Sequence, residues 1–142
     1  GSATSRQGIG VADYFAKAND ETMIVALIED IVAVDNLDSI LKVDHIDVFF
    51  VAPGDLAQSM GHLGGGGPEV GQASHPEVAA VVDRSIAQIV AAGRVPGALV
   101  NDATVADYIG KGAKFLMTGW PAWVGSGAKS YMKKVAMASS EL

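Results

Sequence analysis

Residues 22–29, TMIVALIE, form a nearly continuous apolar run of strand length that ends on Glu29 rather than on a turn. Residues 46–55, IDVFFVAPGD, repeat this arrangement, with Pro53 stopping the second run just before Asp55. Continuous apolar runs are typical of strands that are covered on both faces, as in a parallel sheet. The two stretches therefore predict two buried parallel strands, each followed by a carboxylate.

Further strands and helices alternate along the rest of the chain. Two more short strands are expected at residues 95–101 and 114–120. Helical spacing and helix end signals predict helices at residues 11–20, 34–43, 74–93, 103–112 and 122–137. At roughly 30 residues per strand and helix, this order is that of an α/β fold with right-handed crossovers.

Capping residues mark the expected ends of two helices. Ser74 is expected to be the N-cap of the long helix, with Glu77 completing a capping box and Gly93 ending the helix. Asp102 is expected to cap the helix that follows. Residues 61–74, GHLGGGGPEVGQAS, predict a flexible glycine-rich insert. The insert does not match a phosphate loop, because no Lys followed by Ser or Thr comes after its glycines.

Two architectures fit this order of elements: an open flavodoxin-like sheet and part of a (β/α)8 barrel. A complete barrel typically needs about 250 residues, so the 142 residues here would form about half of one. An open regulatory domain would need a phosphate-accepting or nucleotide-binding loop after the first strand. Residues 29–36, EDIVAVDN, contain no glycine for such a loop.

Composition and charge argue against several classes of partner. The net charge of −6 disfavours nucleic acid and anionic membrane surfaces, because both are bound through clustered Lys and Arg. No apolar run reaches the roughly 18 residues of a membrane span, and the first residues lack a signal-peptide pattern. The absence of cysteine excludes disulfides and thiolate metal sites. We therefore expect a cytoplasmic protein that binds neither nucleic acid nor membranes.

The functional site is expected where the strands end, because catalytic and binding residues of parallel α/β sheets lie at the carboxyl ends of the strands. Those ends carry Glu29, Asp55, Asn101 and Trp120. Two carboxylates on neighbouring strands are tolerated close together chiefly when a cation lies between them. Without Cys or clustered His, such a site suits Mg²⁺ or Mn²⁺. The alternative is that Glu29 and Asp55 only cap helices at the start of loops.

Several motifs in a characteristic order carry a resemblance to a known family. They are ALIED (26–30), AVDNLD (33–38), PGDL (53–56), HPEV (75–78) and KFLMTGW (114–120). These motifs resemble those of the HpcH/HpaI family of class II pyruvate aldolases, which includes 4-hydroxy-2-oxoheptanedioate and 2-keto-3-deoxy-sugar-acid aldolases. The resemblance covers nearly the whole chain.

The resemblance implies that residues 1–142 form the C-terminal half of a (β/α)8 TIM barrel, with four strand–helix units, completed by another chain or fragment. It implies that Glu29 and Asp55 ligate a divalent ion, Mg²⁺ or Mn²⁺, with Co²⁺ as a third candidate. The backbone N–H groups of Gly54 and Asp55 match the position where the family holds the carboxylate of pyruvate, although Gly54 replaces the more usual Ala.

The implied activity is that of a metal-dependent aldolase, a lyase that cleaves or forms 4-hydroxy-2-oxo acids through a metal-bound pyruvate enolate. Pyruvate and an aldehyde are the implied substrates, and the ion acts as a Lewis acid. A non-catalytic half barrel that binds metal or an oxo acid is the first alternative. Decarboxylation of oxaloacetate, which passes through the same enolate, is the second.

No catalytic residue is assigned in this chain, because the resemblance places the base, a His assisted by an Asp, and an Arg in the N-terminal half. His45 is expected at the opposite end of the sheet and His75 in a capping box. His62 borders the insert and is the remaining, weaker candidate for acid–base chemistry. Leu27 stands where the family usually has a Gln that contacts the substrate.

Assembly is the last expectation from the sequence. An isolated half barrel would expose its strand edges and its interior face, so residues 24–28 and 48–52 are expected to face water unless a complementary half covers them. The resemblance implies homo-oligomers, commonly hexamers, that associate through the last helix, here residues 121–138. Trp120 and Trp123 are expected to form either a pocket wall or anchors of a core or interface.

Overall fold

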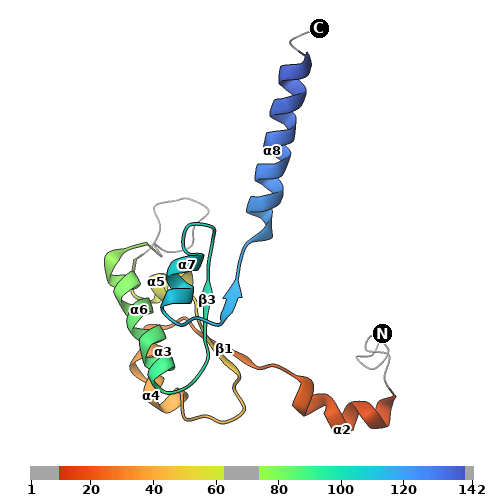
Figure 1. Cartoon of the computed structure of the whole chain (residues 1–142). Helices are drawn as coiled ribbons and strands as arrows, with labels where there is room; N and C mark the ends of the chain where they lie inside the picture. Colours follow the sequence, from red (N-terminus) through yellow and green to blue (C-terminus); the bar gives the residue numbers. More distant parts are fainter. Residues whose placement is uncertain (1–9, 63–73, 140–142) are drawn as a thin grey trace.

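The computed structural model describes residues 10–62 and 74–139 of the chain. Its centre is a parallel sheet in the order β1-β2-β3-β4, so strands that follow each other in sequence are neighbours in the sheet (Figure 1). The strands are β1 (Val25–Ile28), β2 (Val48–Val51), β3 (Pro96–Leu99) and β4 (Phe115–Met117). A flavodoxin-like sheet would place the first strand between the second and the third. The observed order is that of consecutive strands in a (β/α)8 barrel, which confirms the barrel prediction over the open sheet.

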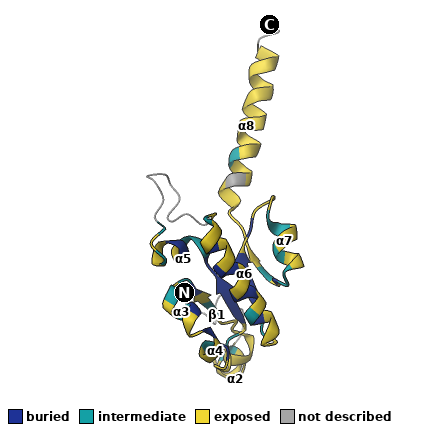
Figure 2. Cartoon of the chain, turned by 90° about the vertical axis from the view of Figure 1, so that its left-hand side faces the viewer, coloured by how far each residue is buried: buried dark blue, intermediate teal, exposed yellow. Residues whose placement is uncertain are grey.

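The helices of the compact part gather on one face of this sheet (Figure 2). They are α3 (Ile31–Asp35), α4 (Leu37–Ile40), α5 (Pro53–Ser59), α6 (Pro76–Ala91) and α7 (Val105–Gly110). The main core joins Phe49 and Val51 of β2 to apolar residues of α6 that recur every three or four positions, namely Val78, Val82, Ile86 and Ile89. This helical spacing places the apolar stripe of α6 on the sheet.

The opposite face of the sheet is the one that would line a barrel interior. A smaller apolar cluster covers part of it, made of Val48, Phe50 and Ala52 with Val25, Val95 and Phe115 packed against them. The Phe50 ring lies against Gly97 of the next strand and meets Phe115 edge to face, with ring centroids 6.2 Å apart. The expectation that residues 48–52 face water is therefore wrong, because Phe50 occupies the space that Gly97 leaves free.

The rest of that face remains open to solvent, as a half barrel requires. Leu27 is 55% exposed on this face, and Ile24, which precedes β1, is 48% exposed, whereas Ile28 is buried against the helices, so the expectation for residues 24–28 holds in part. Leu99 and Met117, at the ends of β3 and β4, are also exposed. Large apolar side chains left exposed on one face of a sheet mark a surface that another element can cover.

The helix expected at residues 34–43 is replaced by two shorter helices. α3 begins earlier than expected, at Ile31, where the Asp30 carboxylate accepts a hydrogen bond from Val32 N at 2.7 Å. Asn36 separates α3 from α4, and its side-chain amide donates to Val32 O at 2.8 Å. An Asn side chain that bonds the preceding turn offers the backbone an alternative to a continuous helix.

The long helix α6 confirms its expected end and corrects its expected start. Gly93 ends it with a φ of 71°, and Arg94 N then bonds the carbonyl of Ile89 at 3.0 Å, as in a Schellman motif. The N-cap is His75 instead of Ser74. Pro76 occupies the first helical position, so the residue directly before it must be the cap.

The start of α7 also differs from the expectation. Its N-cap is Thr104, and Asp102 caps no helix. The side-chain oxygen of Asn101 accepts hydrogen bonds from Ala103 N and Thr104 N, at 2.9 Å and 3.1 Å. Asn101 thus binds Thr104 N, one of the backbone donors that Asp102 was expected to satisfy, and α7 begins two residues later than predicted.

Two helices extend away from the compact part (Figure 1). They are α2 (Val11–Glu21) and α8 (Trp120–Ser139), and no side chain that the structure describes in either of them is buried. None of the described helices is long and apolar enough to span a membrane. The predicted insert at residues 61–74 lies largely outside the described residues, which stop at His62 and resume at Ser74.

Candidate functional site

The two carboxylates expected to bind a metal lie near the carboxyl ends of neighbouring strands. Glu29 is the residue after β1, and the parallel register pairs Ile28 with Val51, the last residue of β2. Ala52 N, directly after β2, donates to Ile28 O at 3.1 Å, so the two chain segments leave the sheet side by side. Asp55 follows in the first turn of α5. Its expected place at the end of a strand is therefore wrong, because a helix begins immediately after Ala52.

Neither carboxylate is used to cap a helix. Asp30, and not Glu29, caps α3, while the N-cap of α5 is Ala52, which provides no side-chain hydrogen bond. Among the residues that the structure describes, the side chains of Glu29 and Asp55 make no hydrogen bond and no ion pair. The capping alternative is therefore wrong. Both carboxylates keep their full capacity to bind a cation, for which an all-oxygen ligand set favours a hard divalent ion.

The start of α5 adds hydrogen-bond donors beside these carboxylates. Pro53 is the first residue of the helix and has no N–H group. The first backbone donor within α5 is Leu56 N, which bonds Ala52 O at 3.1 Å. The N–H groups of Gly54 and Asp55 precede it and, as at other helix starts, lack an intrahelical acceptor. Such groups are suited to bind anionic oxygens. That the N–H groups of Gly54 and Asp55 bind the carboxylate of pyruvate stays a prediction.

A cavity of about 290 Å³ lies beyond the ends of β3 and β4. It is lined by Val100, Asn101, Asp102, Val105, Leu116, Thr118 and Trp123. The indole nitrogen of Trp123 donates to Asp102 Oδ1 at 3.3 Å, so the first turn of α8 closes one side of this cavity. Of the two tryptophans considered from the sequence, Trp123 forms a pocket wall, whereas Trp120 lies outside the lining and is 67% exposed.

Two other positions considered from the sequence lie where they were expected. His45 precedes β2, at the amino end of the sheet, and adopts a positive φ of 61°. Leu27 lies in β1, paired with Phe50, on the open face of the sheet. An apolar side chain at this position offers no hydrogen bond, so a substrate on this face would need another donor or acceptor.

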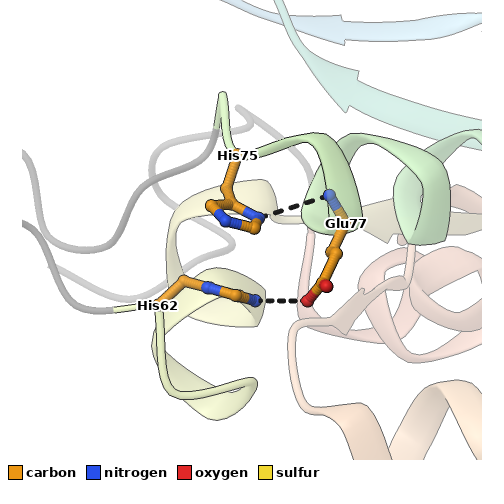
Figure 3. Close-up of side chains that lie close together, drawn as sticks. All are labelled: His62, His75 and Glu77. Atoms are coloured by element: carbon orange, nitrogen blue, oxygen red, sulfur yellow. Dashed lines mark hydrogen bonds and ion pairs between the residues drawn. The ribbon is translucent and has the colours of Figure 1, made fainter.

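A second group of polar side chains was not foreseen as a unit. His62, just after α5, meets His75 and Glu77 at the start of α6 (Figure 3). His62 Nε2 and Glu77 Oε2 are 3.0 Å apart, and the two imidazole rings stack with centroids 3.8 Å apart. The sequence separates His62 from the other two by the glycine-rich insert, and α5 packs against α6 to bring them together. The motif HPEV, which contains His75 and Glu77, is the signal in the sequence, and neither the capping box nor the family resemblance predicts that His62 joins it.

Comparisons with known proteins agree with this architecture. A profile of the family described as HpcH/HpaI aldolase/citrate lyase matches residues 2–124. A hydroxypyruvate/pyruvate aldolase of Roseovarius nubinhibens is 40% identical over 110 residues, which are 77% of this chain and 40% of that protein. A 4-hydroxy-2-oxo-heptane-1,7-dioate aldolase of Salmonella typhi is 41% identical over 110 residues, again 77% of this chain and 39% of that protein.

Solved structures give the same relationship in three dimensions. An HpcH/HpaI aldolase/citrate lyase family protein of Burkholderia cenocepacia superposes with a TM-score of 0.77 at 26% identity, covering 96% of this chain and 52% of that one. An HpcH/HpaI aldolase of Desulfitobacterium hafniense gives a TM-score of 0.64 at 26% identity, covering 94% and 49%. The chain thus spans about two fifths of the curated relatives and about half of these TIM-barrel structures. It belongs to the HpcH/HpaI aldolase/citrate lyase family.

Proposed function

We propose that this chain supplies the metal-binding edge of a divalent-metal-dependent aldolase that cleaves or forms 4-hydroxy-2-oxo acids, with pyruvate and an aldehyde as the smaller reactants. One observation carries the proposal. Glu29 follows β1 directly and Asp55 lies in the first turn of α5, just after the neighbouring strand β2. Neither side chain has a hydrogen-bond or ion-pair partner among the described residues. A divalent cation bound by both carboxylates would neutralise the charge of both.

The residues at this edge have different tasks in the proposed reaction. Glu29 and Asp55 hold the ion, for which Mg²⁺ or Mn²⁺ is preferred over Co²⁺ because the ligands are carboxylate oxygens. When bound, the ion supplies positive charge that polarises the keto group of a 2-oxo acid and stabilises negative charge that develops on it. The N–H groups of Gly54 and Asp55 orient the acid's own carboxylate at the start of α5.

The names of the relatives support the choice of reaction. Both describe aldolases, one naming pyruvate and the other a 4-hydroxy-2-oxo diacid. We assign the aldehyde to the cavity beyond β3 and β4, because Asn101 and Thr118 offer it polar groups while Trp123 limits its size. A decarboxylase acting on oxaloacetate would use the same carboxylates, and it is separated from the aldolase by the substrate that is consumed.

The proposed reaction also needs a complementary N-terminal half of the barrel. Removal of a proton from the methyl group of pyruvate requires a base, which the family resemblance places in that half together with an Arg. The exposed side chains of Leu27, Leu99 and Met117 mark the face against which it packs. We further propose that closed barrels associate through α8, as hexamers, and that the protein works in the cytoplasm.

Metal binding by variants tests the ligand assignment directly. Glu29→Gln and Asp55→Asn each remove one charged ligand while keeping the shape of the side chain. We expect each variant to abolish Mn²⁺ binding measured by isothermal titration calorimetry and to keep the far-ultraviolet circular dichroism of the parent chain. Asp30→Asn is the matched control, because it neutralises the adjacent carboxylate while Asn still caps α3. Undiminished Mn²⁺ binding in both Glu29→Gln and Asp55→Asn would refute the assignment.

Turnover and assembly are tested on the chain together with a family N-terminal half. We expect the pair to release pyruvate from a 4-hydroxy-2-oxo acid in a Mn²⁺-dependent way, and a pair that binds Mn²⁺ without turnover would favour the non-catalytic alternative. Light scattering tests the assembly. A well-folded monomer of 14.6 kDa that forms no complex with the added half contradicts the half-barrel proposal.

A further inference from the structure

We propose that His62, His75 and Glu77 form a second metal site that takes a transition-metal ion such as Zn²⁺ and joins α5 to α6. Each side chain offers one ligand atom, and these atoms lie within 4.8 Å of one another. Two imidazoles and one carboxylate are a common ligand set of zinc sites that keep a position open for water. The inference goes beyond the proposed aldolase function and does not depend on it.

The spacing of the cluster is close to what a tetrahedral ion requires. Zn–N distances of about 2.0–2.1 Å place two nitrogen ligands on one ion roughly 3.4 Å apart. His62 Nε2 already lies 3.0 Å from Glu77 Oε2, and the rings of His62 and His75 stack with centroids 3.8 Å apart. The lone pairs of stacked rings lie in nearly parallel planes, so the two planes must tilt beyond the present 21° to meet at one ion. Both histidines are only partly buried, which leaves room for this rotation.

The hydrogen bonds within the cluster are ones that an ion can replace (Figure 3). His75 Nδ1 accepts from Glu77 N at 3.3 Å, just beyond the usual range of about 2.7–3.2 Å, so its lone pair is present and only weakly used. His62 Nε2 would exchange its hydrogen bond with the Glu77 carboxylate for a bond to the ion, and the ring proton would then be carried on Nδ1. The His62 and Glu77 side chains are 22% and 72% exposed, which gives an ion access from solvent.

Ligand chemistry separates this site from the one proposed at the strand ends. Glu29 and Asp55 present carboxylate oxygens only, which suit Mg²⁺ and Mn²⁺. The cluster at the start of α6 presents two imidazoles, which suit Zn²⁺, Ni²⁺ or Cu²⁺. An excess of Mg²⁺ is therefore expected to occupy the strand-end site while it leaves the imidazole site available for Zn²⁺.

The full chain contains three histidines, which makes a spectroscopic test direct. Zn²⁺ is titrated into the 142-residue chain in excess Mg²⁺ while the imidazole resonances are followed by NMR. The resonances of His62 and His75 are expected to shift together and to saturate at one equivalent of Zn²⁺. The resonance of His45, which lies before β2 and outside the cluster, is expected to stay unchanged.

Variants assign the ligands by calorimetry under the same conditions. His62→Gln and Glu77→Gln each remove one ligand, and His75→Asn removes an imidazole but keeps a residue that caps α6. Each change is expected to weaken Zn²⁺ binding on the order of 100-fold. The total free energy of Zn²⁺ binding is large and is divided among few ligands, so the loss of one ligand removes a large part of it. His45→Asn is the matched control, since it removes a histidine elsewhere and Asn tolerates a positive φ.

Three outcomes would overturn the inference. One is Zn²⁺ binding that persists in both His62→Gln and Glu77→Gln. Another is Zn²⁺ binding that is lost in the Glu29→Gln, Asp55→Asn double variant, which would move the ion to the strand ends. The third is an unchanged spectrum of His62 and His75 in excess Zn²⁺, which would make the cluster a hydrogen-bonded link between helices only. Circular dichroism of each variant separates loss of a ligand from loss of the fold.

Discussion

A single methyl group added at Gly97, in β3, is expected to destabilise the sheet that carries the candidate site. The added Cβ would lie 2.7 Å from Cδ2 of Phe50, 3.0 Å from Cγ1 of Val48 and 3.2 Å from the Cα of Phe50. Carbon atoms in favourable contact are about 3.5–4.0 Å apart. The Phe50 ring must therefore move by roughly 0.8 Å (3.5 minus 2.7), and the contact with its Cα also requires β2 and β3 to separate slightly.

Gly97→Ala is expected to lower the free energy of unfolding by about 2 kcal/mol in total. Overpacking a tight core costs about 1–3 kcal/mol. The displaced Phe50 ring also loses part of its edge-to-face contact with Phe115, which is worth about 0.5–1.5 kcal/mol. In the other direction, Ala restricts the unfolded chain more than Gly does, which stabilises by about 0.4–1 kcal/mol.

A double-mutant cycle in urea measures this effect at one fixed protein concentration, because association also contributes to stability. In a Phe50→Leu background the clashing ring is gone, so Gly97→Ala is expected to cost less by about 1 kcal/mol, a coupling typical of residues in contact. Gly110→Ala at the end of α7 is the control, since a Cβ there meets nothing within 4 Å. An unchanged unfolding midpoint for Gly97→Ala, or an equal cost in both backgrounds, would show that the Phe50 contact does not govern this position.

Two further predictions concern charged side chains in the helical layer. The Arg94 guanidinium donates to the carbonyls of Leu41, Val43 and Ile46 at 2.8–3.1 Å. Arg94→Met is therefore expected to lower the free energy of unfolding by about 2–4 kcal/mol, and Arg94→Lys by less. A loss under about 0.5 kcal/mol for Arg94→Met in urea would show that these hydrogen bonds do not stabilise the fold. Hydrogen bonds from Lys111 to Asp107 and Asp83 raise the pKa of Lys111 above its usual range. Because the pKa of Lys111 is higher in the folded state, its ion pairs contribute their full stability below the unfolded-state pKa of about 10.4. This contribution is lost as the pH rises through the folded-state pKa. Lys111→Met is therefore expected to cost about 0.5–1 kcal/mol at pH 7, as exposed ion pairs do, and the difference from the parent should shrink in alkaline urea titrations and in high salt.

The strands followed from local patterns in the sequence, whereas the barrel order of the sheet followed from the family resemblance. The apolar run around Val51 is a strand buried on both faces, as a continuous apolar run predicts, whereas the run around Ile28 forms a strand with Leu27 exposed on its open face. Gly93 ends α6 as expected, because a position with positive φ strongly favours glycine. The element boundaries were less exact. The N-cap of α6 is one residue later than predicted because of Pro76. The start of α7 differs because the Asn101 side chain binds nearby backbone donors, and several polar groups compete for such donors.

The sequence by itself determined the fold class of this protein and its family and predicted Glu29 and Asp55 as a metal-binding pair, because these depend on periodicity and on motifs read along the chain. Only the tertiary structure decided that Glu29 and Asp55 have no described partner, and that Phe50 covers the face which Gly97 leaves open. It also brought His62 to within hydrogen-bond distance of Glu77, 15 positions away. Contacts between distant segments arise from how helices and strands pack on one another, and no local pattern of residues specifies that packing.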